Sequence, residues 1–379
     1  MNILFFTHYS SLYGANKSLL SLLINKNKSE MNFIVVIPEE GPFTEELKKQ
    51  GINYRIVPFV LNCQTVPVKA TFRDWLYVRR VSFIRFFHNV RLIPQLLRII
   101  KKSAIDTIYS NSSVISIGWW LSLLTSARYI LHIRELREAH YGIKPDWGNF
   151  LFRSHLNSAD HKIAISKTVF DYYNLNSNSS IVYNGIEMSD LPEELTPPDS
   201  KLFSFGVLGH ISHKKGHYLI LEAFAKFMQL GHNAQLVIAG GGDIEDLKHK
   251  ALDLGIQDAV SIIGYVPTDV FFAQIHSMIT ASQYEAFGRT TVESMLFKRP
   301  VIGLNDSGTA EIISDEKTGF LFELNPDSLL EQMLHVFINY TSLDSVINRA
   351  YDYAKYNFSS DRYVNEIFRV INQTCDDCK

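Results

Sequence analysis

Two carboxylate residues, Glu285 and Glu293, stand eight positions apart in a stretch that predicts a strand, a loop and a helix. The apolar residues 278–281 are typical of a short buried strand, and the loop 284–289 that follows contains a glycine. Residues 291–297 have helical spacing. Glu285 is therefore predicted in a strand-to-helix loop, and Glu293 in the first turn of the helix.

The start of this helix suits a phosphorylated ligand. The backbone amides of residues 287–291 are expected to lack partners within the helix, and the helix dipole adds positive potential there. Gly288 lets a ligand come close to the backbone. Carboxylates repel phosphate, so the expected partners of Glu285 and Glu293 are hydroxyl groups of the same ligand. A diphosphate with hydroxyl groups on both sides is a nucleotide sugar.

The same residues fit a second interpretation. Thr290 and Glu293 have the spacing of a capping box, in which the two side chains stabilise the start of a helix. Glu285 would then be an ordinary loop acid. The local sequence leaves both interpretations open.

A family resemblance favours the nucleotide sugar. The stretch resembles the E-x7-E signature of retaining glycosyltransferases of family four, also called glycosyl transferases group 1. The matching residues are Glu285, Phe287, Gly288, Glu293, Pro300, Val301 and Gly308. The resemblance implies an α/β protein with the GT-B fold, in which two Rossmann-like doubly wound parallel-sheet domains face each other across a cleft.

Length and composition agree with a globular protein of two domains. The chain has 379 residues, of which 46% are hydrophobic and 20% charged. A net charge of -2 gives no indication of nucleic-acid binding. We find no signal peptide and no uninterrupted apolar run of membrane-spanning length, so we expect a cytoplasmic protein. Cys375 and Cys378 form one C-x-x-C pair, which supplies half of the ligands of a typical zinc site. We interpret them as thiols of a reducing compartment rather than metal ligands.

Short apolar runs alternate with helical patterns, which predicts parallel sheets that bind ligands at the carboxyl ends of their strands. The proline-rich residues 191–200 are typical of a linker. We predict an acceptor-side domain at 1–190 and a nucleotide-sugar-binding domain at 201–355. The resemblance implies that a carboxyl-terminal helix, 356–379, crosses back to the first domain, and residues 351–370 have the pattern of one long helix.

Two residues of the first domain are candidates for contact with the donor. Gly14 follows the first strand and resembles the core of the family's glycine-rich loop, although a plain strand-to-helix turn is an alternative. His132 ends the predicted strand 128–133 and matches the family's histidine near the transferred sugar. Arg134 and Glu135 beside it favour a functional role over a structural one.

Lys215, followed by Gly216, resembles the family's lysine-glycine pair that contacts the donor diphosphate. The family usually has arginine where this chain has His210, which is neutral much of the time and lacks a bidentate fork. The clamp on the diphosphate is therefore expected either to be weaker or to be completed by Lys214 or Arg289. Residues 260–266 resemble the segment whose backbone faces the nucleotide base, which makes Val266 a further donor-binding candidate.

Residues 69–102 are strongly basic and aromatic. Nine Lys and Arg residues against the single acid Asp74 give a net charge of +8. Such a segment can lie on an anionic membrane surface, bind an anionic acceptor, or pack its aromatic side chains on a sheet while its arginines stay solvated. We expect peripheral contact with a membrane or a lipid-linked acceptor.

The resemblance predicts transfer of a sugar from a nucleoside diphosphate to an acceptor hydroxyl, with retention by a same-face route. Lys215 and the amides of residues 287–290 would stabilise the leaving diphosphate. Glu293 would hold the ribose, while Glu285 and His132 would hold the sugar. No D-x-D motif precedes the donor loop, so no cofactor or essential metal is expected. Alternatives are a sugar-nucleotide epimerase of the same fold and a catalytically inactive binding subunit, for which His210 is the main argument.

Overall fold

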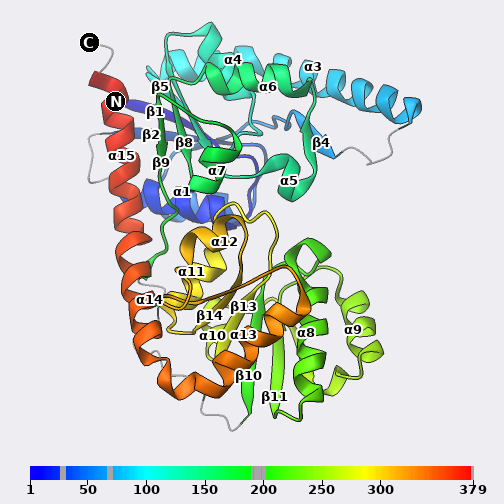
Figure 1. Cartoon of the computed structure of the whole chain (residues 1–379). Coiled ribbons are helices and arrows are strands. Elements are labelled where there is room, and N and C mark those ends of the chain that lie inside the picture. The colour runs from blue at the N-terminus through cyan, green and yellow to red at the C-terminus, as the bar shows by residue number, and fades with distance from the viewer. Residues whose placement is uncertain (26–30, 66–70, 189–190, 192–197, 199–201, 377–379) are drawn as a thin grey trace. The chain divides into compact units, whose positions relative to one another are not determined.

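The computed structural model describes residues 1–25, 31–65, 71–188, 191, 198 and 202–376. The chain forms two compact units. Unit 1 comprises Met1–Gly185 together with the residues from Ser360 onward, and unit 2 comprises Ile186–Ser359. Each unit has its own parallel sheet with helices, so the predicted α/β class with two parallel-sheet domains is confirmed (Figure 1). Lys69, Cys378 and most of the expected linker lie outside the described residues.

Unit 1 is built on a parallel sheet that has, in the described residues, seven strands in the order β3-β2-β1-β5-β6-β8-β9. Its inner strands are apolar and buried, as expected of a parallel sheet. The strands are β1 (Asn2–Phe6), β2 (Asn32–Ile37), β3 (Tyr54–Ile56), β5 (Thr107–Ser110), β6 (Arg128–Ile133), β8 (His161–Ala164) and β9 (Ser179–Ile181), and β4 (Cys63–Thr65) pairs separately with β7 (Ile143–Pro145). The helices are α1 (Gly14–Ile24), α2 (Pro42–Lys49), α3 (Phe72–Lys102), α4 (Ile117–Leu124), α5 (Arg137–Tyr141), α6 (Gly148–Asn157), α7 (Lys167–Tyr172) and α15 (Ser360–Asp376).

The carboxyl-terminal helix α15 belongs to unit 1, where it lies along α1 (Figure 1). The ring of Phe368 stacks on Phe33 of β2 with 6.3 Å between the ring centroids. The prediction of one long helix over residues 351–370 is wrong. The helical conformation is interrupted at Phe358, whose carbonyl oxygen accepts a hydrogen bond from the amide of Ile186.

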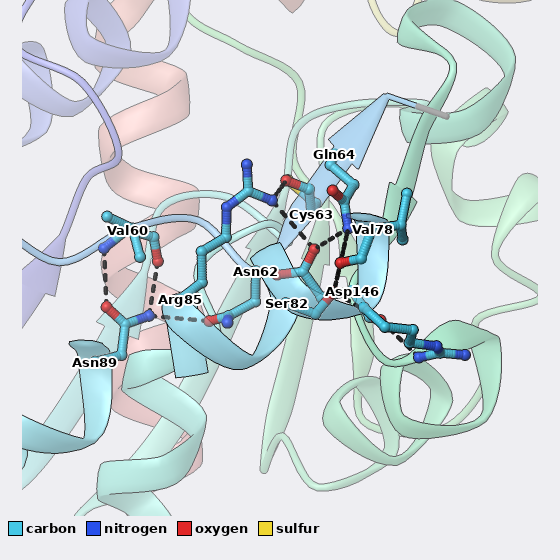
Figure 2. A network of polar contacts seen from close by, with 10 residues as sticks. Val60, Asn62, Cys63, Gln64, Val78, Ser82, Arg85, Asn89 and Asp146 are labelled. Atoms are coloured by element: carbon cyan, nitrogen blue, oxygen red, sulfur yellow. Dashed lines mark hydrogen bonds and ion pairs between the residues drawn. The ribbon is translucent and has the colours of Figure 1, made fainter. Parts of the chain in front are cut away.

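A network of polar contacts around Asp146 fixes helix α3 to the rest of unit 1 (Figure 2). The buried Asp146 Oδ1 accepts hydrogen bonds from Arg85 Nη1 at 3.1 Å and from Gln64 Nε2 at 2.9 Å. Burial raises the pKa of this carboxyl group, and the Arg85 charge opposes that rise. Arg85 also donates to the Cys63 carbonyl oxygen, and Arg79 donates to that of Asp146. Two arginines of the basic segment therefore have structural partners.

Unit 2 has a second parallel sheet, with six strands among the described residues in the order β12-β11-β10-β13-β14-β15. The strands are β10 (Phe203–Leu208), β11 (Ala234–Ala239), β12 (Val260–Gly264), β13 (Ser277–Thr280), β14 (Val301–Leu304) and β15 (Phe320–Phe322). The helices are α8 (His217–Gln229), α9 (Ile244–Asp253), α10 (Thr268–Phe272), α11 (Arg289–Leu296), α12 (Ser307–Ile312), α13 (Pro326–Asn339) and α14 (Asp344–Asn357), with short 3-10 turns at η3 (His213–Lys215), η4 (Gln257–Ala259) and η5 (Tyr340–Ser342). Among the described helices of both units, none has the length and apolar composition needed to cross a membrane.

Buried histidines make the stability of the fold depend on pH. Burial lowers the pKa of His155 to about 3 and that of His217 to about 4, and it holds the pKa of His132 well below its ordinary value. In the unfolded chain these groups bind protons below a pH of about 6.5. The unfolded state then binds more protons than the native state, so stability decreases as the pH falls.

We expect the free energy of unfolding to fall by about 1.4 kcal/mol per pH unit for each such histidine once the pH is below about 6.5. Urea denaturation between pH 7.5 and pH 5 measures this slope. Changing the buried His155 to Gln should reduce the slope by about 1.4 kcal/mol per pH unit, the contribution of one proton. A stability that stays constant over this range would contradict the prediction.

Candidate functional site

The loops that carry most of the predicted site residues follow strands β10 and β13 of unit 2. These strands are parallel neighbours, although β11 and β12 come between them in sequence and lie on the other side of β10. The connections after β10 and β13 therefore diverge at the carboxyl end of the sheet. This is the position at which open parallel sheets bind their ligands.

The loop after β10 is in direct contact with the loop after β13. Gly216 has a φ of +76°, and a Cβ atom there would lie 2.4 Å from the carbonyl oxygen of Ala281. Only glycine therefore fits at this position. The amide of Gln283 donates a hydrogen bond of 3.0 Å to the carbonyl oxygen of Lys214. These contacts hold Lys215 close to the loop that contains Glu285.

Lys215 and Glu285 form an ion pair, with 2.7 Å between Nζ and Oε2. Their side chains are 26% and 20% exposed, so an incoming ligand can reach both. Sequence spacing alone does not reveal this contact, since the two residues are 70 positions apart. The pair combines a cation that suits phosphate with an acceptor that suits hydroxyl groups.

A third loop, after β14, supports Glu285 from a neighbouring strand. The amide of Gly308 donates to the carbonyl oxygen of Glu285 at 2.8 Å, and Asp306 Oδ2 accepts from the amide of Tyr284 at 2.7 Å. Tyr284 has a φ of +56°, which is uncommon for a bulky residue. Asp306 was not among the residues predicted for the site, although its position just after a buried strand was an available signal.

Helix α11 begins earlier than the sequence predicts. Gly288, with a φ of +89°, is its N-cap and Arg289 its first residue, so Glu293 lies in the second turn and not in the first. The capping-box interpretation is wrong because Thr290 is already inside the helix. The amide of Thr291 donates to the carbonyl oxygen of Gly288 at 3.1 Å. This amide is therefore engaged, contrary to the expectation that it would be available to a ligand.

The second acid of the motif, Glu293, is buried and pairs with a residue of its own helix. Its Oε1 lies 2.9 Å from Nε of Arg289. Phe287 is also buried, and its ring packs edge to face on Phe358. The motif thus contributes two acids to the site, each beside a cation.

The remaining unit 2 candidates occupy neighbouring strand ends. His210 is exposed after β10, beside the glycine turn that follows β11, because a Cβ atom on Gly242 would lie 3.1 Å from His210 Cε1. Lys214 is exposed in the same loop as Lys215, and Val266 is half-buried after β12. All of these residues follow strands of one sheet.

In unit 1, Gly14 is the first residue of α1 and follows the turn after β1. His132 is completely buried in β6, and its Nδ1 lies 2.6 Å from the hydroxyl oxygen of Tyr109. The core of unit 1 therefore fixes the orientation of the His132 ring and limits the access of a ligand to it.

The neighbours that favoured a functional role for His132 have structural partners. Arg134 donates hydrogen bonds to the side chains of Asn111, Asn184 and Tyr363. Glu135 accepts hydrogen bonds from the hydroxyl groups of two consecutive serines, 112 and 113. This cluster connects β6 to α15 and to the loop after β5.

Among the residues that the structure describes, no group of three or more His, Cys, Asp or Glu side chains is arranged to hold a metal ion. The positive charge near Glu285 and Glu293 comes from Lys215 and Arg289.

Comparison with known proteins identifies the unit 2 motif. Residues 191–353 match the family model "Glycosyl transferases group 1". The match lies within unit 2 and covers less than half of the chain. Together with relatives that are named as glycosyltransferases, it confirms the enzyme class that the resemblance implied, so the chain is a glycosyltransferase by class.

Curated relatives are distant. This chain is 27% identical over 208 residues to an uncharacterized glycosyltransferase of Methanocaldococcus jannaschii, and the match covers 50% of this chain and 53% of that protein. It is 28% identical over 313 residues to alpha-monoglucosyldiacylglycerol synthase of Streptococcus pneumoniae, covering 73% of this chain and 69% of the relative.

Solved structures confirm the fold. Anabaena HepE in complex with UDP and glucose superposes with a TM-score of 0.76 at 17% identity, covering 98% of this glycosyltransferase and 100% of HepE. The predicted GT-B fold is therefore confirmed.

Proposed function

We propose that this glycosyltransferase moves a sugar from a nucleoside diphosphate to an acceptor hydroxyl, with retention at the anomeric carbon. The observation that supports the proposal most is the Lys215–Glu285 pair at the carboxyl ends of β10 and β13. A nucleotide sugar needs a cation for its diphosphate and an acceptor for its hydroxyl groups, and this pair supplies both. The complexes of HepE with UDP and with UDP-glucose support a donor of this class.

In the proposed mechanism, Lys215 turns from Glu285 toward the diphosphate and stabilises the charge that develops as the phosphate leaves. The amides of Phe287, Gly288 and Thr290 add hydrogen-bond donors. Glu285 then accepts hydrogen bonds from the sugar hydroxyl groups. His210, Lys214 and Arg289 line the diphosphate side, and the backbone at Val266 faces the base.

Retention follows from a same-face route in which the leaving phosphate helps to remove the proton of the acceptor. Lys215 supplies the positive charge that a bound metal ion would otherwise supply to the diphosphate, so no divalent ion is required. Gly14 and His132 complete the donor site from unit 1 in this proposal. Because the His132 ring is fully buried, its contact with the sugar requires movement of the surrounding loops on binding.

We propose a glycan or lipid-linked acceptor and a role in polysaccharide or glycolipid assembly on the cytoplasmic side of a membrane. The name of the pneumococcal relative supports a lipid acceptor. Helix α3 supports peripheral contact with the membrane, because Phe72, Trp75 and Tyr77 are more than half exposed.

Replacing Lys215 with Ala should lower kcat by about 100-fold or more with a smaller effect on KM, because the charge acts in the transition state. Steady-state kinetics with saturating donor, in buffer with EDTA, measures the effect. Lys226→Ala, at the surface of unit 2, is the matched control, and its kcat and KM should equal those of the wild type. A normal kcat for Lys215→Ala would reject the role, and loss of wild-type activity in EDTA would show that a metal is needed.

Replacing Glu293 with Gln should weaken binding of the preferred nucleoside diphosphate by roughly 1 to 3 kcal/mol, since the ribose hydroxyl groups lose a charged acceptor. Titration calorimetry with UDP, GDP and ADP identifies that nucleotide. Inorganic pyrophosphate is the control ligand, because it has no ribose and its affinity should be unchanged. Equal losses for both ligands would instead point to Arg289, the ion-pair partner of Glu293.

Changing Arg80 and Arg91 together to Glu should reduce co-sedimentation with phosphatidylglycerol vesicles by about tenfold or more, at about 1 kcal/mol per basic residue. Arg79 and Arg85 are unsuitable because they bind the Asp146 region. Charge reversal at Lys226 and Lys248 of unit 2 is the control. If the Arg80 and Arg91 variant sediments like the wild type, α3 is not the membrane contact.

Incubation of donor without acceptor separates the rival functions. An epimerase would convert the nucleotide sugar in the absence of any acceptor. A binding subunit would bind nucleotide, yet show neither transfer nor donor hydrolysis above that of a Glu285→Ala variant.

A further inference from the structure

Unit 1 contains an aromatic pocket that the transfer reaction does not use. Its volume is about 360 Å³, and its walls come from α3, α4, α6 and the segment around β7. Phe83, Phe86, Trp119, Trp120, Trp147 and Leu151 form most of the lining. An apolar cavity of about 150 Å³ is large enough for benzene, so this pocket has room for an apolar chain of roughly a dozen carbons.

The aromatic side chains of the pocket hold one another in place. Phe83 packs edge to face on Trp147 with 5.0 Å between ring centroids, and Phe86 packs in the same way on Trp120 at 5.4 Å. Trp119 stacks on His155. The pocket is therefore formed without a ligand, which lowers the entropic cost of binding.

One formal charge lines this pocket, that of Arg137. The residue is 6% exposed, and its guanidinium carbon lies 3.3 Å from the ring centroid of Phe152. Among the described residues no carboxylate oxygen lies within 4.0 Å of it, and its Nε donates only a long hydrogen bond of 3.4 Å to Tyr173. The nearby Glu135 is engaged by Ser113. His155 adds no charge, because burial keeps it neutral near pH 7. A buried cation of this kind has its charge only partly compensated.

The entrance of the pocket is apolar and continues into a basic surface. Phe83 is 51% exposed and Leu151 41% exposed, although both line the pocket. A second hollow on the outer side of α3 shares Phe83 and is bordered by Arg80 and Arg91. An amphiphile would thus meet the charges of Arg80 and Arg91 outside the apolar entrance and the charge of Arg137 inside the pocket.

We propose that the aromatic pocket of unit 1 binds a single-chain anionic lipid, with its acidic group on Arg137 and its apolar chain along the tryptophans. Charge complementarity selects the acid, and the aromatic lining selects the chain. Neither feature depends on the donor site or on sugar transfer, so lipid binding and sugar transfer are tested independently of each other.

Binding is tested with 12-bromododecanoate, whose bromine quenches the fluorescence of an indole that it touches. Of the four tryptophans in the chain, three line the pocket, so a Trp75→Phe background restricts the signal to them. We expect saturable quenching below the micelle concentration, and calorimetry with unbrominated dodecanoate should give a matching Kd. Hexanoate, with the charge and a short chain, should bind at least tenfold more weakly.

The variant Arg137→Gln should weaken dodecanoate binding tenfold or more and leave dodecan-1-ol binding unchanged. Arg153→Gln removes an exposed charge from α6 and is the matched control, which should bind normally. Leu151→Glu, at the half-exposed entrance, should weaken dodecanoate binding without disturbing the core. Absence of quenching, equal affinity of the Arg137→Gln variant and the wild type, or an equal loss in Arg153→Gln would each overturn the proposal.

Discussion

The contact between the ends of β10 and β13 is the constraint on which the candidate site depends. Parallel pairing brings these strands together, and the absence of a side chain at Gly216 lets one loop rest against the Ala281 carbonyl group. Only then can Lys215 reach Glu285 across 2.7 Å. A larger residue at Gly216 would separate the loops and, with them, the cation from the acid.

The strand, loop and helix around Glu285 and Glu293 were readable from sequence because local patterns determine them. The helix start was not, since it depends on Gly288 adopting a left-handed conformation that no periodicity reveals. The pairing of Lys215 with its acid was also beyond the sequence, whereas Arg289 and Glu293 are four residues apart on one helix. Lys215 and Glu285 meet only through the order of strands in the sheet, and Asp306 enters through a third strand of that sheet.

His132 shows a different limit of sequence reasoning. A histidine near the end of a strand, followed by Arg134 and Glu135, has the composition of a site. The contacts of these residues are with remote parts of the chain: Arg134 donates a hydrogen bond to Tyr363, which is 229 positions away, and Tyr109, the partner of His132, comes from the neighbouring strand. The cluster consequently lies within the core, and its charges connect secondary-structure elements.

Helix α3 shows why the net charge of residues 69–102 alone could not decide between contact with a membrane and packing within the protein. Its arginines divide between two tasks: Arg85 compensates the buried Asp146, while Arg80 and Arg91 border an exposed hollow. Its aromatic side chains divide as well, with Phe86 packed on Trp120 and Phe72 exposed. Because the Asp146 network fixes the rotation of the helix about its axis, it decides which residues line the pocket and which face solvent. The network around the buried Asp146 therefore sets both surfaces that we connect with lipid.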